Sequence, residues 1–398
     1  MTRGLAARMA AVYLALRAVT AVIILFAVDD QVPVESWTGP SVDYFDMTVL
    51  WDGSWYRTVA EHGYPQVLPL DPTSGHPSQN PWAFYPLFPL VSRGLMGLTG
   101  LGFPVVASML ALVCGLGAAL LMAGLLTDRV GSRVALATVA VWAAFPAAVS
   151  LQLAYTESLA MLVLCGFLWA VIRQRWAVTA ALALVLGLTR PIALPLLAVV
   201  AVALFVRWRG RAEQPVARGE YAAGAGAIVA CGVSGLVWPS IAWAVTGSPT
   251  AYTDTMAAWR AGGEIVPLKP WLWMSEWVFR EHALAGSYGP VALAAVVTVI
   301  VVMVCGPWAR ALGPELRAWC LAYPAYLGLV LDPFTSIFRY LLPLFPLLVV
   351  VLGGGWADRR VPRFLWPRTA LLVAAGVAGQ VAWVFHLLVF VPPSDYPP

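Results

Sequence analysis

Charged residues are scarce in this chain of 398 residues: only 11% of its residues are charged, whereas 61% are hydrophobic. A soluble protein would carry about a quarter charged residues, so the composition excludes an ordinary soluble domain. Apolar runs such as 105–126 and 221–245 reach the ~20 residues that a helix needs to cross a bilayer. The composition therefore predicts an all-α polytopic membrane protein that is surrounded by a lipid bilayer.

Several motifs are also missing. The sequence has no P-loop, no G-x-G-x-x-G and no obvious internal repeat, and the net charge of +4 comes from loop arginines. The five cysteines contain no C-x-x-C pair and lie in or beside apolar runs, which predicts small buried residues without a disulfide framework. The four histidines lack ligand spacing, and Asp43 with Asp46 is the nearest approach to an acid pair. We therefore expect no cofactor and no nucleic-acid partner. The sequence gives only weak support for a divalent metal.

Hydropathy and loop residues predict about eleven membrane spans. The first apolar run lacks a small-residue cleavage site, so we expect it to be retained as a helix. The segment 83–98 contains Pro86 and Pro89, which favours a short or re-entrant helix over a full span. The expected spans are 9–28, 104–126, 133–150, 157–172, 176–190, 192–207, 221–246, 288–308, 316–331, 337–353 and 369–391.

The charges of the loops predict the orientation of these spans. When the N-terminus and every second loop are assigned to the cytoplasm, most of the 24 Lys and Arg residues fall on that side. All four histidines and most of the acidic residues fall on the other side. The positive-inside rule therefore predicts a cytoplasmic N-terminus and an extracytoplasmic C-terminus. We expect residues 1–398 to form a single multi-pass domain in the plasma membrane.

Two outer loops, 29–81 and 246–287, are long and rich in aromatic residues. The segment 44–62 of the first loop is amphipathic, which suits a helix lying at the membrane interface. The second loop carries four tryptophans, which we expect on another interfacial helix: Trp259, Trp271, Trp273 and Trp277.

The densest cluster of acidic and aromatic residues lies in the first outer loop, in the run Trp51-Asp52-Gly53-Ser54-Trp55-Tyr56. Asp52 is the principal candidate for a general base, because partial desolvation by Trp51 and Trp55 favours proton acceptance by a carboxylate. A helix N-terminus would oppose this effect by favouring the anion. A plain helix N-cap is the alternative role for Asp52.

Four further residues of this loop are candidates for supporting roles. Asp43 and Asp46 are neighbouring acids. Glu61 and His62 follow Asp52 by roughly two and a half helical turns, so they either line the same groove or form an exposed polar face.

Two arginines, Arg190 and Arg339, are expected at the outer edges of spans, against the positive-inside trend. Arginine can hold a lipid phosphate through two hydrogen bonds, so both are candidates for binding a donor phosphate, together with Tyr340. A salt bridge to a loop acid or snorkelling to headgroups is the alternative. Glu157 opens a span and is either a supporting site residue or an acid stabilised by the helix dipole.

Three segments carry a resemblance to a known family: the run that begins at Trp51, the run Ala60-Glu61-His62-Gly63-Tyr64, and 83–90. Together they resemble the PIG-V family, the GPI mannosyltransferases that add the second mannose, and its bacterial, mainly actinobacterial, relatives. Weaker motifs at 155–159, 189–191 and 338–340, with Phe345-Pro346, follow in the expected order, so the resemblance spans most of the chain.

The resemblance implies a GT-C glycosyltransferase, whose active site faces outward and uses a sugar carried on a polyprenyl phosphate. Such an enzyme would be a polyprenyl-phosphate-mannose-dependent mannosyltransferase that inverts the anomeric configuration. The acid that serves as catalytic base in that superfamily corresponds to Asp52, and Arg339 or Arg190 would stabilise the leaving phosphate. The outer side of a membrane has no ATP or sugar nucleotide, which agrees with a donor carried on a lipid.

The resemblance and the composition together indicate the acceptor class. Gly53-Ser54 and Tyr85 depart from the eukaryotic pattern, and the many Arg, Ala and Val residues are typical of a GC-rich bacterium. We therefore expect a bacterial plasma-membrane enzyme with a glycolipid, polysaccharide or glycoprotein acceptor. The alternatives are a flippase or transporter for a lipid or a lipid-linked sugar, and a noncatalytic assembly subunit.

Overall fold

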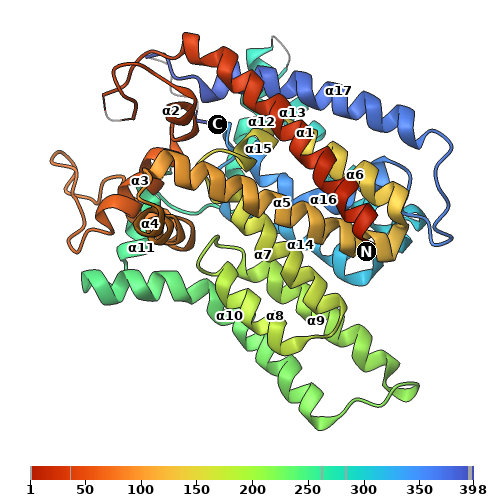
Figure 1. The fold of residues 1–398 in the computed structure, drawn as a ribbon. Coiled ribbons are helices and arrows are strands. Elements are labelled where there is room, and N and C mark those ends of the chain that lie inside the picture. The colour runs from red at the N-terminus through yellow and green to blue at the C-terminus, as the bar shows by residue number, and fades with distance from the viewer. Residues whose placement is uncertain (1, 36, 261–262, 283–284, 393–396) are drawn as a thin grey trace.

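The computed structural model describes residues 2–35, 37–260, 263–282, 285–392 and 397–398 (Figure 1). Within these ranges the chain is helical and forms no strand, and its one sheet-like feature is an isolated antiparallel bridge between Leu70 and Pro77. The predicted all-α fold class is confirmed.

In the described part of the chain, six helical segments of 18 to 29 residues are long and apolar enough to cross a membrane. Much of their apolar surface is left uncovered by the protein; only 11% of the most apolar stretch of α13 is buried. An uncovered apolar surface of this extent is stable against lipid chains and not against water. The chain is therefore a multi-pass membrane protein. The six segments contain α1 (Arg3–Ala27), α5 (Phe103–Val130), α9 (Ala193–Arg209), α10 (Arg218–Thr246), α13 (Tyr288–Cys305) and α17 (Leu365–Trp383).

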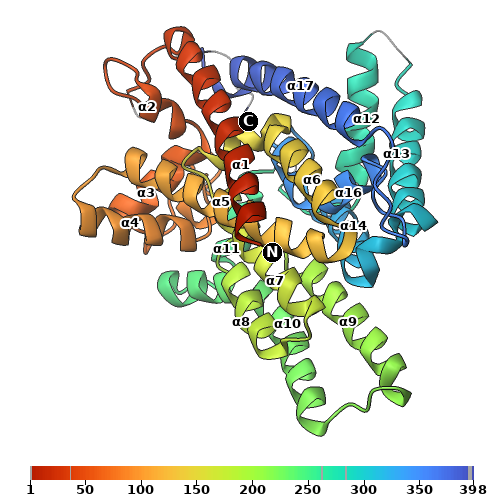
Figure 2. The same ribbon diagram turned by 45° about the vertical axis from the view of Figure 1, so that its right-hand side comes forward.

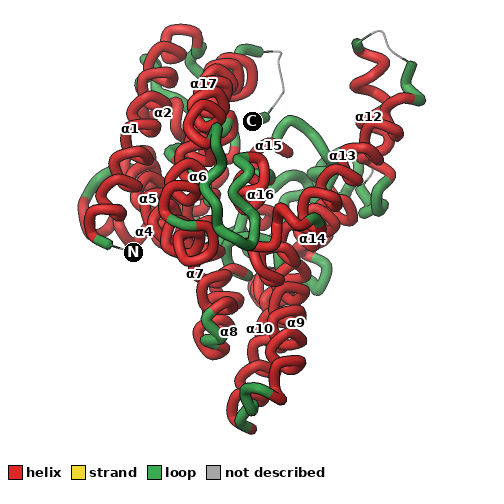
Figure 3. The backbone as a smooth tube through the Cα atoms, turned by 90° about the vertical axis from the view of Figure 1, so that its right-hand side faces the viewer, coloured by secondary structure: helices red, strands yellow, loops and turns green. Residues whose placement is uncertain are grey.

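Further apolar helices pack into the helical body. They are α7 (Glu157–Ile172), α8 (Trp176–Leu186), α14 (Gly313–Val330) and α16 (Phe345–Val351). The helices α8, α9 and α10 pack together and extend away from α1 and α17 (Figures 1 and 3). A Cβ atom on Gly187 of the α8 end would collide with the backbone of Ser234 on α10, so glycine is required for this close approach.

Two predicted spans are interrupted at prolines, so the prediction of continuous helices was wrong there. The first, 133–150, is α6 (Ser132–Ala144) followed by η3 (Pro146–Leu151). The second, 337–353, is α15 (Ile337–Tyr340), η6 (Leu342–Leu344) and α16. Proline lacks an N–H and disfavours the helical conformation in the residue before it. Phe145, which precedes Pro146, accordingly takes an extended ψ of 143°.

Arg17 on α1 stabilises the first of these interruptions. Its side chain is 3% exposed and donates to the carbonyl oxygens of Ala143 and Ala148, which flank the break between α6 and η3. Gln380 on α17 also donates to Ala143 O, at 3.3 Å, and accepts from Thr20 at 2.6 Å. Helix ends leave carbonyl groups without helical partners, and here α1 and α17 supply the missing donors.

Short helices gather at one end of the molecule, at the left of Figure 1, whereas the N-terminus and the loop between α16 and α17 lie at the right. The short helices at the left are α2 (Tyr44–Thr48), α3 (Asp52–His62), α4 (Leu87–Thr99) and α11 (Ala251–Ala257). The single interfacial helix expected over 44–62 is thus two helices, α2 and α3. The short helix expected near 83–98 is confirmed as α4.

The tryptophan-rich loop also differs in part from the expectation. Trp271, Trp273 and Trp277 lie on α12 (Lys269–Glu281), which packs beside α13 (Figure 2), but Trp259 follows α11 instead. The five cysteines are free thiols; four are buried as expected, and Cys305 at the end of α13 is exposed.

Candidate active site

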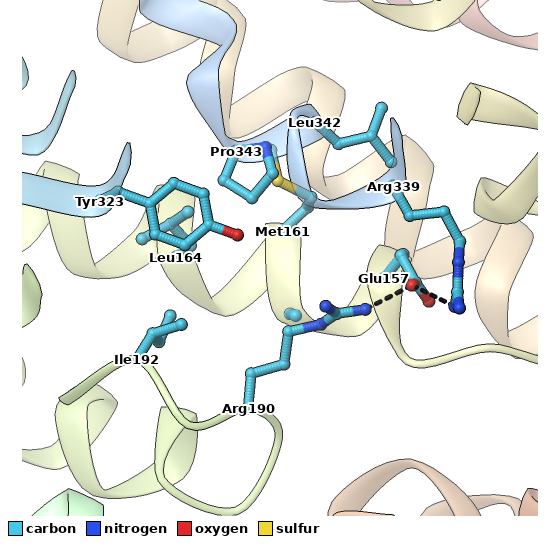
Figure 4. A pocket seen from close by; sticks show the side chains of 10 residues that line it. Glu157, Met161, Leu164, Arg190, Ile192, Tyr323, Arg339, Leu342 and Pro343 are labelled. Carbon is cyan, nitrogen blue, oxygen red and sulfur yellow. Dashed lines mark hydrogen bonds and ion pairs between the residues drawn. The ribbon is translucent and has the colours of Figure 1, made fainter. Parts of the chain in front are cut away.

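Four charged side chains from distant parts of the chain form one connected network. Arg339 lies at its centre: Nη2 is 2.8 Å from Oδ2 of Asp52, and Nη1 is 2.8 Å from Oε1 of Glu157. Arg190 pairs with the same Oε1 atom of Glu157 from the other side, as Figure 4 shows. The network therefore joins the candidate base to both candidate phosphate-binding arginines.

Asp52 is held at the start of α3 by its buried neighbour Trp51. Trp51 has a φ of 58°, which is strained for a bulky side chain and costs about 1–3 kcal/mol. Its indole Nε1 donates to Leu388 O at 2.8 Å, and its ring contacts Trp37 and Phe390. The strained turn is thus maintained by tertiary contacts and directs the first residue of α3 toward Arg339.

The alternative role of Asp52 as a helix N-cap is not observed. Trp51 occupies the cap position, and no side chain makes a capping hydrogen bond at this helix start. The Asp52 side chain is 25% exposed. Among the described residues only Arg339, at Oδ2, makes a polar contact with its carboxylate.

Glu157 is the first residue of α7, and it is 3% exposed. The helix dipole favours a negative charge at this position, as the sequence suggested, but two arginines also contact the carboxylate. Transfer of a carboxylate out of water without such partners would cost too much free energy. Glu157 therefore acts as the buried anion that brings Arg190 and Arg339 together.

Two aromatic rings support the arginines. The Arg190 guanidinium lies over the Tyr340 ring, 5.0 Å from its centroid, and the Arg339 guanidinium lies 4.9 Å from the centroid of Tyr155. The Tyr155 hydroxyl in turn donates to Leu50 O at 3.0 Å, just before the Asp52 turn. Cation–π contacts of this kind orient a guanidinium without using its N–H donors.

Polar atoms without partners surround a small cavity beside the network. The cavity, of about 20 Å³, is lined by Glu157, Arg190, Arg339 and Tyr323 among others. Figure 4 shows the Tyr323 hydroxyl pointing inward from the side opposite Arg339. Oε2 of Glu157, Nε of Arg339 and the Tyr323 hydroxyl are buried without a hydrogen-bond partner among the described residues. A cavity of about this size holds roughly one water molecule.

Tyr56, one turn further along α3, lies close to the same charges. Burial raises the pKa of its hydroxyl well above the usual value, and the nearby Glu157 and Asp52 raise it further. Tyr56 therefore contributes a neutral hydroxyl, and not a charge, to the neighbourhood of the network.

The other predicted supporting residues have different surroundings. Asp43 and Asp46 form a capping box on α2, with Asp46 N donating to Asp43 Oδ1 at 2.9 Å and Asp43 N donating to Asp46 Oδ2 at 3.1 Å. Glu61 pairs with Arg57 at 3.0 Å on the surface of α3. His62 is exposed at the end of that helix. Of the two interpretations of Glu61 and His62, these positions match the exposed polar face.

Trp55 lies one turn after Asp52 and is part of an aromatic cluster. Its ring stacks on Phe84, with centroids 5.6 Å apart and planes inclined by 11°, and meets Trp259 edge-on at 5.5 Å. Trp259 comes from the loop 246–287, so Trp55 joins this loop to α3.

The described residues contain no group of three or more His, Cys, Asp or Glu side chains that could hold a metal ion. The two carboxylates nearest each other in the site, Asp52 and Glu157, are both paired with Arg339.

Two residues of the site were not candidates at the sequence level. Tyr155 is the first residue of the motif 155–159, which also contains Glu157, so its position was a usable signal. Tyr323 lies inside the apolar α14, where a buried aromatic residue is expected in any case and gives no signal.

Comparison with family models and with curated proteins gives no match for this sequence.

Proposed function

We propose that this protein is a membrane glycosyltransferase that transfers mannose from polyprenyl-phosphate-mannose to an acceptor hydroxyl on the extracytoplasmic face. The observation that carries the proposal is the ion pair between Asp52 and Arg339, within a network that also contains Arg190. A base paired with one guanidinium group and linked through Glu157 to a second suits a reaction in which one group loses a proton while a phosphate gains charge.

In the proposed reaction, Oδ1 of Asp52 accepts the proton of the acceptor hydroxyl. The acceptor oxygen attacks the anomeric carbon of mannose, and the bond between that carbon and the phosphate oxygen breaks. The electron pair of that bond leaves with polyprenyl phosphate. A single displacement from the opposite face inverts the configuration at the anomeric carbon.

The network is suited to balance the charges of this step. Asp52 and Glu157 are matched by Arg190 and Arg339, so the four side chains carry no net charge when all are ionised. When Asp52 takes the proton it becomes neutral, and the leaving phosphate gains a negative charge. Arg339, which then has one carboxylate partner fewer, can turn its N–H donors to the phosphate.

Arg190 provides the second phosphate contact in this proposal. A guanidinium has five N–H donors, and the only hydrogen bond from the Arg190 side chain among the described residues goes to Glu157. Tyr340 lies under the guanidinium and holds its plane. The remaining donors suit the bidentate geometry of a phosphate.

The test uses purified protein in lipid nanodiscs with radiolabelled polyprenyl-phosphate-mannose and membrane glycolipid as acceptor. We expect Asp52→Asn to lower mannose transfer at least about 100-fold while donor binding persists, because only the proton acceptor is removed. Glu61→Gln, on the same helix but paired on the surface, is the matched control and should stay within about twofold of the parent. Near-parental transfer by Asp52→Asn would assign the base to another residue.

A further inference from the structure

A second, larger cavity lies between the two outer loops. It has a volume of about 1040 Å³. The loop after α3 contributes Asp71, His76 and Gln79, the segment from α11 onward contributes Asp254 and Glu264, and Trp55 of α3 completes the wall. Small-molecule sites typically enclose about 300–1,000 Å³, so this cavity has room for a ligand larger than one sugar ring.

The two walls of the cavity are tied to each other. Asn80 is 1% exposed, and its Nδ2 donates to Thr255 Oγ1 of α11 at 3.0 Å. The next residues are anchored as well, since Trp82 Nε1 donates to Pro65 O at 2.9 Å and Trp238 Nε1 on α10 donates to Trp82 O at 3.0 Å. Contacts of this kind preform the cavity, which lowers the entropy that a ligand loses on binding.

One wall is aromatic. Trp55 is partly exposed, and its stacking on Phe84 and edge contact with Trp259 fix the orientation of its ring. The C–H groups on one face of a pyranose ring are apolar, so they pack on such an indole, and the hydroxyl groups at the rim remain available for hydrogen bonds. A fixed indole beside polar loops therefore suits a carbohydrate.

The charged residues in the rest of the lining discriminate between ligands by their charge. Asp71, Asp254 and Glu264 are carboxylates, and no lysine or arginine is found among the described residues that line the cavity. The backbone N–H groups of Ser74 and Thr73 donate to Asp71 and lower the pKa of its carboxyl, so this group is ionised at neutral pH. Carboxylates accept hydrogen bonds from hydroxyl groups and repel anions.

Trp55, which lines the cavity, lies on the same helix as Asp52. Trp55 follows Asp52 by three residues on α3, and residues at this spacing lie on one face of a helix with Cβ atoms about 5–6 Å apart. Asp52 is not among the residues that line the cavity, so the cavity adjoins the charged network through Trp55.

We propose that this cavity is the acceptor site and that it takes an uncharged carbohydrate, excluding acceptors that carry carboxylate or phosphate groups near the reacting hydroxyl. This proposal rests on the transferase function proposed above. It narrows the acceptor to a neutral glycolipid, polysaccharide or glycoprotein glycan.

The test is a binding measurement on the 398-residue chain in nanodiscs, by saturation-transfer NMR. The two probes are methyl α-D-mannopyranoside and methyl α-D-mannopyranosiduronate. In the second, called the uronate below, C6 is oxidised to a carboxylate, so the two probes differ in one charged group. We expect the neutral glycoside to bind at least about fivefold more tightly than the uronate, because the lining repels the anion.

Two variants link the binding to the cavity. Trp55→Ala should weaken binding of the neutral glycoside about fivefold by removing the stacking surface. The double variant Asp254→Asn/Glu264→Gln keeps the shapes of the side chains, and it should reduce the preference over the uronate to about twofold or less. Asp128→Asn changes an exposed carboxylate that pairs with Arg173 outside the cavity, and it should leave both affinities unchanged.

The inference is overturned if the uronate binds as tightly as the neutral glycoside, if neither binds, or if neither cavity variant changes binding. Mannose transfer from the lipid donor, measured on the same samples, separates this result from the proposed function. Transfer without the expected binding pattern refutes the acceptor site alone. The expected binding pattern in a protein that never releases polyprenyl phosphate supports a sugar site and refutes the transferase.

Discussion

Removal of Arg339 should destabilise the protein, because this side chain neutralises two carboxylates at once. Its side chain is 6% exposed, and that of Glu157 is 3% exposed. Breaking a buried ion pair by removing one partner costs about 3–5 kcal/mol. Arg190 would still neutralise Glu157, and Asp52 can be hydrated, so for Arg339→Met we expect the lower end, about 3 kcal/mol in the free energy of unfolding.

A double-mutant cycle measures the interaction energy between Arg339 and Glu157. Glu157→Gln alone should also destabilise the protein by about 3 kcal/mol, since it leaves two guanidinium groups without their shared anion. In the double variant both charges are gone, so its loss should fall short of the sum of the single losses by at least about 1.5 kcal/mol. The free energy of unfolding is measured by denaturant titration in mild detergent.

The control is the exposed pair between Arg173 and Asp128, whose side chains are 53% and 55% exposed. Arg173→Met should change the free energy of unfolding by no more than about 0.5 kcal/mol, because exposed ion pairs contribute little. Losses at Arg339 and Glu157 that add to within about 0.5 kcal/mol would show that the two residues do not interact as described.

Three further variants test other parts of the structure. Arg17→Met should destabilise the protein by about 2 kcal/mol, since the carbonyls of Ala143 and Ala148 lose their donor; an unchanged free energy of unfolding would contradict this role. Gly53→Val should lower mannose transfer about tenfold with donor binding retained, because a Cβ there would lie 3.2 Å from Thr48 O and displace the Asp52 turn; parental transfer rates would show that the turn tolerates the shift. Tyr323→Phe should raise the free energy of unfolding by about 1 kcal/mol by removing a buried hydroxyl without a partner, and a loss of stability would mean that the hydroxyl is hydrogen-bonded, for example to a buried water.

The long membrane helices could be predicted from the sequence, because their length and apolar composition are local properties. The predicted span 104–126 corresponds to α5, and the span 221–246 corresponds to α10. The breaks at Pro146 and Pro343 were missed because hydropathy averages over a window and does not register a single missing N–H.

The division of 44–62 into two helices was missed for a different reason. It depends on the positive φ of Trp51, and a bulky residue adopts this conformation only when distant groups such as Leu388 O hold it. Such a turn has no local sequence signal, in contrast to a turn built on glycine or asparagine.

The separate members of the charged network could be named from the sequence, but their connection could not. Asp52, Glu157, Arg190 and Arg339 stood out as polar residues in apolar surroundings. That Arg339 bridges Asp52 and Glu157 follows from tertiary packing over long sequence separations, which a single sequence does not encode locally. The phosphate-binding and salt-bridge roles weighed for the arginines are also not exclusive, because a guanidinium paired with a carboxylate keeps other donors.

The proposed function requires that the protein cleaves the bond between mannose and a polyprenyl phosphate. The most direct measurement is the amount of polyprenyl phosphate released when purified protein in nanodiscs is given polyprenyl-phosphate-mannose and membrane glycolipid. We predict release in equal amount to the mannose transferred, and loss of both in Asp52→Asn. Movement of the intact donor across the bilayer without any release of polyprenyl phosphate would contradict the proposed transferase and indicate a flippase.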